Sequence, residues 1–180
     1  MDLTEKMLDS KEIFDGRMLH LFVDTVSLPN GAISTREVIR HPGAVVIAPV
    51  DEQGRVYLVR QFRYPAGKVL LELPAGKLEA GEDPLEAAKR ELAEEVGAAA
   101  AHWTALGTAL PVGGYCSEVH HFFLARGLTF GTTHFDEDEF LEQAVIPMDE
   151  LFAMAADGRL DDEKSVVGVL RAWHTMKGEV

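Results

Sequence analysis

The sequence predicts an α+β fold, or a mixed α/β/α sandwich, built from one main domain. Three observations predict it: short apolar runs that end at turn residues, one strongly signalled helix in the middle, and strands that alternate with helices towards the C-terminus. With 180 residues, of which 47% are hydrophobic, the chain has the size and composition of one globular domain. It can therefore bury a proper core.

The first forty or so residues have the pattern of β-structure. Residues 19–28 and 32–40 flank the turn at residues 29–31, where asparagine and glycine tolerate positive φ. Residues 43–50 form a short apolar run typical of a buried strand. A polar turn joins this run to residues 55–63, so we expect the two segments to be neighbouring strands of one sheet.

The best-signalled helix begins after Asp83, a favourable N-cap, and has Pro84 at its first position. Glu86 completes a capping-box pattern, and Gly97 provides the C-terminal stop. Apolar residues recur between them at helical spacing and should face the core. They are Leu85, Ala88, Leu92 and Val96.

The C-terminal third predicts two strands and two helices. The strands are expected at residues 119–125 and 141–146, and the helices at residues 147–156 and 161–176. In the last helix an apolar stripe is expected to face the core. It consists of Val166, Val167, Leu170 and Trp173.

Composition excludes several classes of protein. The formal charge of −13 argues against nucleic acid as a partner, because phosphate backbones attract basic faces. No apolar run approaches the roughly 18 residues of a membrane helix, and the N-terminus lacks the order of a signal peptide. One cysteine, Cys116, cannot form an internal disulfide, so we expect a cytoplasmic protein without a membrane partner.

Residues 76–98, GKLEAGEDPLEAAKRELAEEVGA, concentrate the acidic side chains. On a helix Glu91 and Glu95 lie on the same side, one turn apart, and Ala87 and Ala88 beside them should leave room for ions. Carboxylates near a helix C-terminus are unfavourable unless a cation neutralises them, and Mg²⁺ prefers carboxylate and phosphate oxygens. The alternative is a solvated glutamate face, which is common on surface helices.

The spacing within this segment decides between the two interpretations. Seven specified positions would coincide by chance on the order of once in a billion windows at ordinary residue frequencies. The segment resembles the Nudix box, a loop–helix–loop that binds divalent metal at a diphosphate, with Ala98 replacing the usual bulky aliphatic residue. The specified positions are Gly76, Glu82, Arg90, Glu91, Glu94, Glu95 and Gly97.

The resemblance implies the Nudix fold, a mixed-sheet α/β/α sandwich, and a role for each box residue. It implies that Glu91 and Glu95 bind the metal directly, and that Glu94 either binds it or is held by Arg90. Glu82 and Arg90 orient these ligands. A further ligand in similar enzymes is the backbone carbonyl of Ala75. The implied cofactor is Mg²⁺, with Mn²⁺ as a substitute.

Outside the box the chain resembles the ADP-ribose pyrophosphatase branch, which acts on nucleoside diphosphate sugars. The similarity is carried by residues 28–31, 41–43, 59–65 and 71–76. It implies an N-terminal β extension at residues 1–42, used for dimerisation, and a Nudix hydrolase domain at residues 43–180. A homodimer is therefore expected, and a sheet added to a monomer is the alternative.

The branch also implies contacts with the substrate. Arg60 or Arg63 would bind the diphosphate, with Arg63 aligning better, because guanidinium matches phosphate oxygens in a bidentate way. Arg36 and Glu37 would approach the nucleoside. Phe22 would stack on the base, although strand aromatics are more often packing residues. Glu118 matches a glutamate that members of this branch have in the same loop.

A second acidic cluster, residues 136–139, would complete the site in such enzymes. Glu137 is the preferred base for the attacking water, and Glu139 is a ligand or a substitute base. The products from ADP-ribose would be AMP and ribose 5-phosphate. Gly113 stands where the branch usually has proline, which weakens the assignment of the sugar without changing the reaction.

Three hypotheses follow from the sequence. The first is hydrolysis of a nucleoside diphosphate sugar, ADP-ribose before ADP-glucose or GDP-mannose. The second is a broad Nudix diphosphatase that also accepts other nucleotides and dinucleotides. The third is a sensor that binds ADP-ribose without cleaving it. Sensors tend to lose the box carboxylates, which this chain retains.

Overall fold

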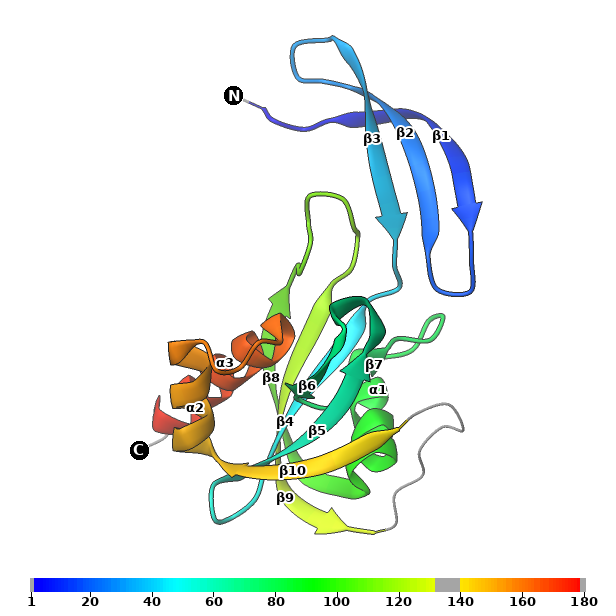
Figure 1. Cartoon of the computed structure of the whole chain (residues 1–180). Helices are drawn as coiled ribbons and strands as arrows, with labels where there is room; N and C mark the ends of the chain where they lie inside the picture. The colour runs from blue at the N-terminus through cyan, green and yellow to red at the C-terminus, as the bar shows by residue number, and fades with distance from the viewer. Residues whose placement is uncertain (1, 132–139, 179–180) are drawn as a thin grey trace. The chain divides into compact units, whose positions relative to one another are not determined.

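The computed structural model describes residues 2–131 and 140–178 (Figure 1). Within these residues the chain divides into two compact units, each described here by itself. The first comprises Met1–Gly43 with Leu110–Val119, and the second comprises Ala44–Ala109 with His120–Val180. The expected boundary at residue 42 stays a prediction, and the structure adds that Leu110–Val119 belongs to the first unit.

The first unit contains an antiparallel sheet of order β1-β2-β3, formed by Lys6–Asp15, His20–Ser27 and Ile33–Arg40. The predicted turn lies between β2 and β3, where Gly31 has a φ of 82° and donates its N–H to the carbonyl of Leu28. The predictions for β2 and β3 are confirmed. The separate strand β1 was not predicted, because two register shifts interrupt its alternation of side chains.

Segment Leu110–Val119 is hydrogen-bonded to the end of β3. The N–H of Ile39 donates to the carbonyl of Tyr115, and the N–H of Ser117 donates to the carbonyl of Ile39. Ile39 thus forms a parallel bridge with Cys116. These bonds explain why a segment distant in the sequence joins the first unit.

The second unit contains a seven-stranded mixed sheet with the path β10-β5-β4-β9-β8, to which β6 and β7 add by pairing with β5 and β4. The β4–β9 pair is parallel, and the other pairs are antiparallel. The strands are β4 (Ala44–Val50), β5 (Arg55–Arg63), β6 (Lys68–Glu72), β7 (Ala75–Lys77), β8 (Ala98–Ala109), β9 (His120–Phe130) and β10 (Leu141–Pro147).

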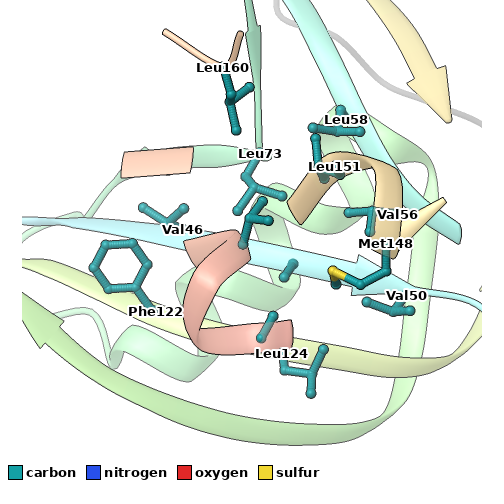
Figure 2. Close-up of a cluster of buried hydrophobic side chains, with 13 residues drawn as sticks. Val46, Val50, Val56, Leu58, Leu73, Phe122, Leu124, Met148, Leu151 and Leu160 are labelled. Atoms are coloured by element: carbon teal, nitrogen blue, oxygen red, sulfur yellow. The ribbon is translucent and has the colours of Figure 1, made fainter. Parts of the chain in front are cut away.

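The helices cover both faces of this sheet, as the two clusters of buried side chains show. They are α1 (Pro84–Glu91), the π-helical turn η2 (Leu92–Val96), α2 (Met148–Asp157) and α3 (Glu163–Gly178), with a short 3₁₀ turn η1 (Tyr64–Ala66) between strands. Alternate residues of β4 face opposite layers. Val46 packs with the side chains of α2 and α3 (Figure 2), whereas Val45 packs with those of α1. The expected mixed-sheet α/β/α sandwich is confirmed.

The core-facing stripe of α3 differs from the prediction. Leu170 is 37% exposed, whereas Ser165, Gly168, Val169 and Ala172 are the buried residues. A Cβ on Gly168 would lie 2.5 Å from the Cδ1 of Leu73, so the helix approaches the sheet more closely than a larger side chain would allow. The prediction was wrong for Leu170, whereas Val166, Val167 and Trp173 are partly buried and pack against this core.

No helix in the described part of the chain is both long and apolar enough to cross a membrane.

Candidate active site

The acidic segment forms strand β7, a loop and the α1–η2 helix. In β7, Gly76 pairs with Val45 of the central strand β4. Ala87 and Ala88 are fully buried against β4. They therefore fix the helix to the sheet. The expectation that they leave room for ions was wrong.

Helix α1 begins as predicted. The carboxylate of Asp83 accepts hydrogen bonds from the N–H groups of Leu85 (2.9 Å) and Glu86 (3.3 Å), which satisfies two unpaired donors of the first turn. The side chain of Glu86 accepts from Lys89 instead of reaching back to the N-cap. Only half of the capping box is therefore formed.

The last turn of this helix is a π-helix, Leu92–Val96, and ends at Gly97 with a left-handed φ of 67°. Single π-turns are rare in proteins, and those that occur are frequently found at functional sites. The sequence predicted an ordinary α-helix through Val96. The wider turn changes the angle around the axis between Glu91 and Glu95, so their side chains are not related by α-helical spacing.

The carboxylates of Glu91 and Glu95 both meet the Ala75–Gly76 segment. A Cβ on Gly76 would lie only 1.8 Å from Oε1 of Glu91, so the absence of a side chain there makes room for the carboxylate. Glu95 is 5% exposed, and its Oε2 accepts a hydrogen bond of 3.2 Å from the N–H of Ala75. Gly76 is thus required for space, because its φ is not positive.

Arg90 connects three acidic residues of the segment. Its Nε and Nη2 each donate to the carboxylate of Glu82 at 3.0 Å, and its Nη1 donates to Glu91 (2.7 Å) and Glu94 (3.1 Å). Hydrogen bonds from Arg90 lower the pKa of Glu82. The same bonds raise the pKa of Arg90. Both groups are therefore charged at neutral pH, and Glu94 is held by Arg90, one of its two expected roles.

Arg63 pairs with a buried carboxylate. Its Nε and Nη2 donate to Glu72 at 2.7 and 2.6 Å, and Glu72 is 1% exposed. The ammonium of Lys164 binds the same carboxylate and also donates to Asp162 at 2.9 Å. Burial raises the pKa of Glu72, but hydrogen bonds from Arg63 and Lys164 outweigh it and lower the pKa overall. The carboxylate is thus ionised between two cations.

Arg63 also lies within electrostatic range of the box. Its hydrogen bonds to Glu72 raise its pKa, and the charge of Glu95 contributes in the same direction. Arg60, the other candidate for the diphosphate, is half exposed and 3.9 Å from the carboxylate of Glu142.

The remaining predicted substrate residues belong to the first unit. Arg36 binds the carboxylate of Glu5, and the ring of Phe22 lies 3.8 Å beneath the guanidinium of Arg40. Glu37 lies opposite Val23 in the sheet. The carboxylate of Glu118 is 3.5 Å from Nδ1 of His41.

Two predicted residues, Glu137 and Glu139, lie outside the described residues. Among residues 2–131 and 140–178, no three His, Cys, Asp or Glu side chains are grouped so as to hold a metal ion. The carboxylates of Glu91 and Glu95 both lie against the Ala75–Gly76 segment. Carboxylate and backbone carbonyl oxygens are the ligands that Mg²⁺ prefers in proteins. Glu91, Glu95 and the backbone at Ala75–Gly76 therefore fit such a cation.

Sequence reasoning missed three residues of this region: Glu72, Lys164 and Gln143. Glu72 pairs with both Arg63 and Lys164. The available signal was a glutamate within an apolar strand, which indicates a buried ion pair. Gln143 of β10 donates to the carbonyls of Glu95 and Val96, and an isolated glutamine in a strand gives no such signal.

Comparisons with known proteins give the family. A model of the Nudix domain matches residues 39–167, and a model of the nucleoside diphosphate sugar hydrolase N-terminal domain matches residues 5–39. A crystal structure of an ADP compounds hydrolase superposes with a TM-score of 0.88 over 99% of this chain and 98% of its own. At 24% identity, that likeness supports the fold alone.

Curated relatives carry more than one name. A methanol dehydrogenase activator from Bacillus methanolicus is 39% identical over 92% of this chain and 90% of its own. An ADP-ribose pyrophosphatase from Bacillus subtilis is 37% identical over 93% of this chain and 91% of its own. A GDP-mannose pyrophosphatase from Pectobacterium atrosepticum is 33% identical over 96% of both chains. The chain therefore belongs to the Nudix hydrolase family and is an ADP-ribose pyrophosphatase-like diphosphate hydrolase.

Proposed function

We propose that this chain hydrolyses the diphosphate bond of a nucleoside diphosphate sugar, preferring ADP-ribose and yielding AMP and ribose 5-phosphate. The observation that carries the reaction is the convergence of the Glu91 and Glu95 carboxylates on the Ala75–Gly76 segment. The substrate class is supported by the N-terminal match at residues 5–39, and ADP-ribose by the name of the Bacillus subtilis relative.

The cofactor we propose is Mg²⁺, with Mn²⁺ able to replace it. Glu91, Glu95 and the carbonyl of Ala75 would hold it, and Glu94 would join them on leaving Arg90. When bound, the cation would neutralise phosphate charge and lower the pKa of a coordinated water. Arg90 donates hydrogen bonds to Glu82 and Glu91, which keeps the Glu91 carboxylate oriented without a cation.

Arg63 is the residue we propose for the diphosphate. Its Nε and Nη2 are held by Glu72, whereas no hydrogen bond from its Nη1 occurs among the described residues. The side chain of Arg63 is 42% exposed, so Nη1 can donate to a phosphate oxygen while the other two nitrogens keep the guanidinium in place. Arg60 would add a second positive charge.

For the nucleoside and sugar we propose Arg36, Glu37, Phe22 and Glu118. In the structure Arg36 is paired with Glu5, and that exposed pair costs little to exchange for a ligand. We propose Glu137 as the base, with Glu139 as its substitute or a ligand. Replacing each separately distinguishes them, because the base variant should lose rate far more than metal affinity.

A broader or different specificity is the second candidate. The GDP-mannose pyrophosphatase covers 96% of this chain, and Gly113 departs from the usual proline at the sugar end. Hydrolysis of GDP-mannose would use the same carboxylates. The two candidates therefore differ in substrate and share the reaction.

The experiment uses a panel of ADP-ribose, ADP-glucose, GDP-mannose and dinucleotides with Mg²⁺. The products are phosphomonoesters, so added alkaline phosphatase releases phosphate only after the diphosphate is cleaved. Glu95→Gln should lower the rate at least about 100-fold, whereas Glu86→Gln, on the same helix and exposed, should not change it. Equal rates for Glu95→Gln and wild type would overturn the proposed site, and faster cleavage of GDP-mannose would overturn the preference for ADP-ribose.

A further inference from the structure

Gln143 connects strand β10 to the end of the α1–η2 helix, which carries the Nudix-box glutamates and is called the box helix below. In the sheet it pairs with Val59 of β5. Its side-chain Nε2 donates to the carbonyls of Glu95 (3.0 Å) and Val96 (3.1 Å), which are 48 and 47 residues away in the sequence. A carboxamide nitrogen has two N–H donors, so this one group satisfies both carbonyls.

These two carbonyls need an outside donor. The last carbonyls of any helix have no intrahelical partner, and unpaired carbonyls are costly where water is excluded. Val96 is 4% exposed and Glu95 is 5% exposed. Gly97, which closes the turn, donates its own N–H to Ala93. Gln143 therefore completes the hydrogen bonding of the π-turn.

The turn that Gln143 completes is the one that orients Glu95. The side chain of Glu95 is hydrogen-bonded to the N–H of Ala75, and its backbone carbonyl is bonded to Gln143. Glu95 is thus restrained at both ends, by β7 on one side and by β10 on the other. Without the carboxamide, the helix end is free to adopt the commoner α-helical turn, which would rotate Glu95 relative to Glu91.

We propose that Gln143 is a positioning residue for the metal-binding carboxylates: it keeps the last turn of the box helix π-helical and so sets the orientation of Glu95. This inference rests on the proposed metal site. Gln143 itself binds neither the cation nor the substrate. It acts on metal affinity through the backbone of Glu95.

The test measures Mn²⁺ binding by the full-length chain without substrate, by electron paramagnetic resonance of the free ion. Gln143→Met removes both donors and keeps an unbranched side chain of similar length. We expect its Kd for Mn²⁺ to rise about 10- to 100-fold. Gln53→Met is the matched control, because Gln53 lies in the exposed turn between β4 and β5, and its Kd should equal that of wild type.

Two further measurements separate positioning from general stability. Gln143→Asn retains a polar side chain but is one methylene too short to reach both carbonyls, so it too should weaken Mn²⁺ binding if Gln143→Met does not fold. Amide hydrogen exchange at residues 92–98 should be faster in the folded Gln143 variants, with the sheet unchanged. A purely structural role would lower the urea midpoint and leave the Kd of the folded fraction unaltered.

The outcomes distinguish this inference from the proposed function. If wild type binds Mn²⁺ and a folded Gln143 variant binds it within about twofold, which is about 0.4 kcal/mol, the inference is overturned alone. If wild type and Glu95→Gln show the same Mn²⁺ binding, the proposed metal site fails, and the inference fails with it.

Discussion

The guanidinium of Arg63 and the carboxylate of Glu72 form a two-point ion pair, with Nε–Oε1 and Nη2–Oε2 distances of 2.7 and 2.6 Å. The side chain of Glu72 is almost completely buried, whereas that of Arg63 is 42% exposed. One partner therefore belongs to the core and the other reaches solvent. Lys164 balances the buried charge from the side of α3.

Glu72→Gln should destabilise the chain by about 2 to 3 kcal/mol, because it leaves two cations against a neutral group and solvent screens only Arg63. Urea unfolding at pH 7 measures this difference. Glu150→Gln, an exposed position on α2, should remain within about 0.5 kcal/mol of wild type. If the Glu72→Gln variant is as stable as wild type, the ion pairs of Glu72 do not stabilise the fold, and the prediction is wrong.

The difference between Glu72→Gln and wild type should depend on pH. The pKa of Glu72 is lowered in the folded chain from an ordinary value of 4.5, so the unfolded chain binds more protons near that pH. The stabilisation is complete above pH 4.5 and is lost as pH falls through the lowered pKa of the folded state. Unfolding curves between pH 7 and 3 should converge for the two chains, and a constant gap would refute this account.

Gly76→Ala should impair the site more than the fold. The new methyl would overlap the Glu91 carboxylate, which is the end of a flexible side chain and can move away. We expect the urea midpoint to change little and hydrolysis to fall by about 10- to 100-fold. Gly178→Ala is the control, because a Cβ there meets no atom within 4 Å. Full activity in Gly76→Ala would show that the position of Glu91 is unimportant.

We propose a homodimer through residues 1–42, and β1 supplies the test. Nearly all of its residues are exposed, including Leu8 at 57%. Among the described residues it is an edge strand that pairs with β2 alone, and an edge with exposed apolar side chains is suited to a partner chain. Leu8→Ser should shift wild-type dimers towards monomers in light scattering at micromolar concentration. Glu12→Ser on the same strand should leave the mass unchanged. A monomeric wild type would exclude the dimer.

Local signals predicted much of the fold. Asp83 and Gly97 bound the box helix because capping depends on neighbouring residues, and both ends are confirmed. The turn at Gly31 and the buried strand β4 are confirmed for the same reason. The box residues could be identified because their spacing is a property of one continuous segment.

Elements that depend on distant partners were not predicted. Strand β8 begins with a run of alanines, a composition without strand preference, and is held by its pairing with β9. The π-turn depends on bonds from Gln143 that come from another strand. Arg63 lies opposite Lys68 and Glu72 lies opposite Val59 in the β5–β6 pair, so their contact depends on the reach of the long arginine side chain along the sheet, which no local pattern indicates.

The chain passes between its two compact units three times, because Leu110–Val119 lies between two strands of the second unit. During synthesis, Ile39 emerges early, but its N–H and carbonyl must wait for Tyr115 and Ser117, more than seventy residues later, for the hydrogen bonds that they form. Contacts of such sequence separation form slowly. The N-terminal unit therefore cannot finish folding ahead of the rest, and a shortened chain that begins at Ala44 would keep a ten-residue segment whose strand partner is gone.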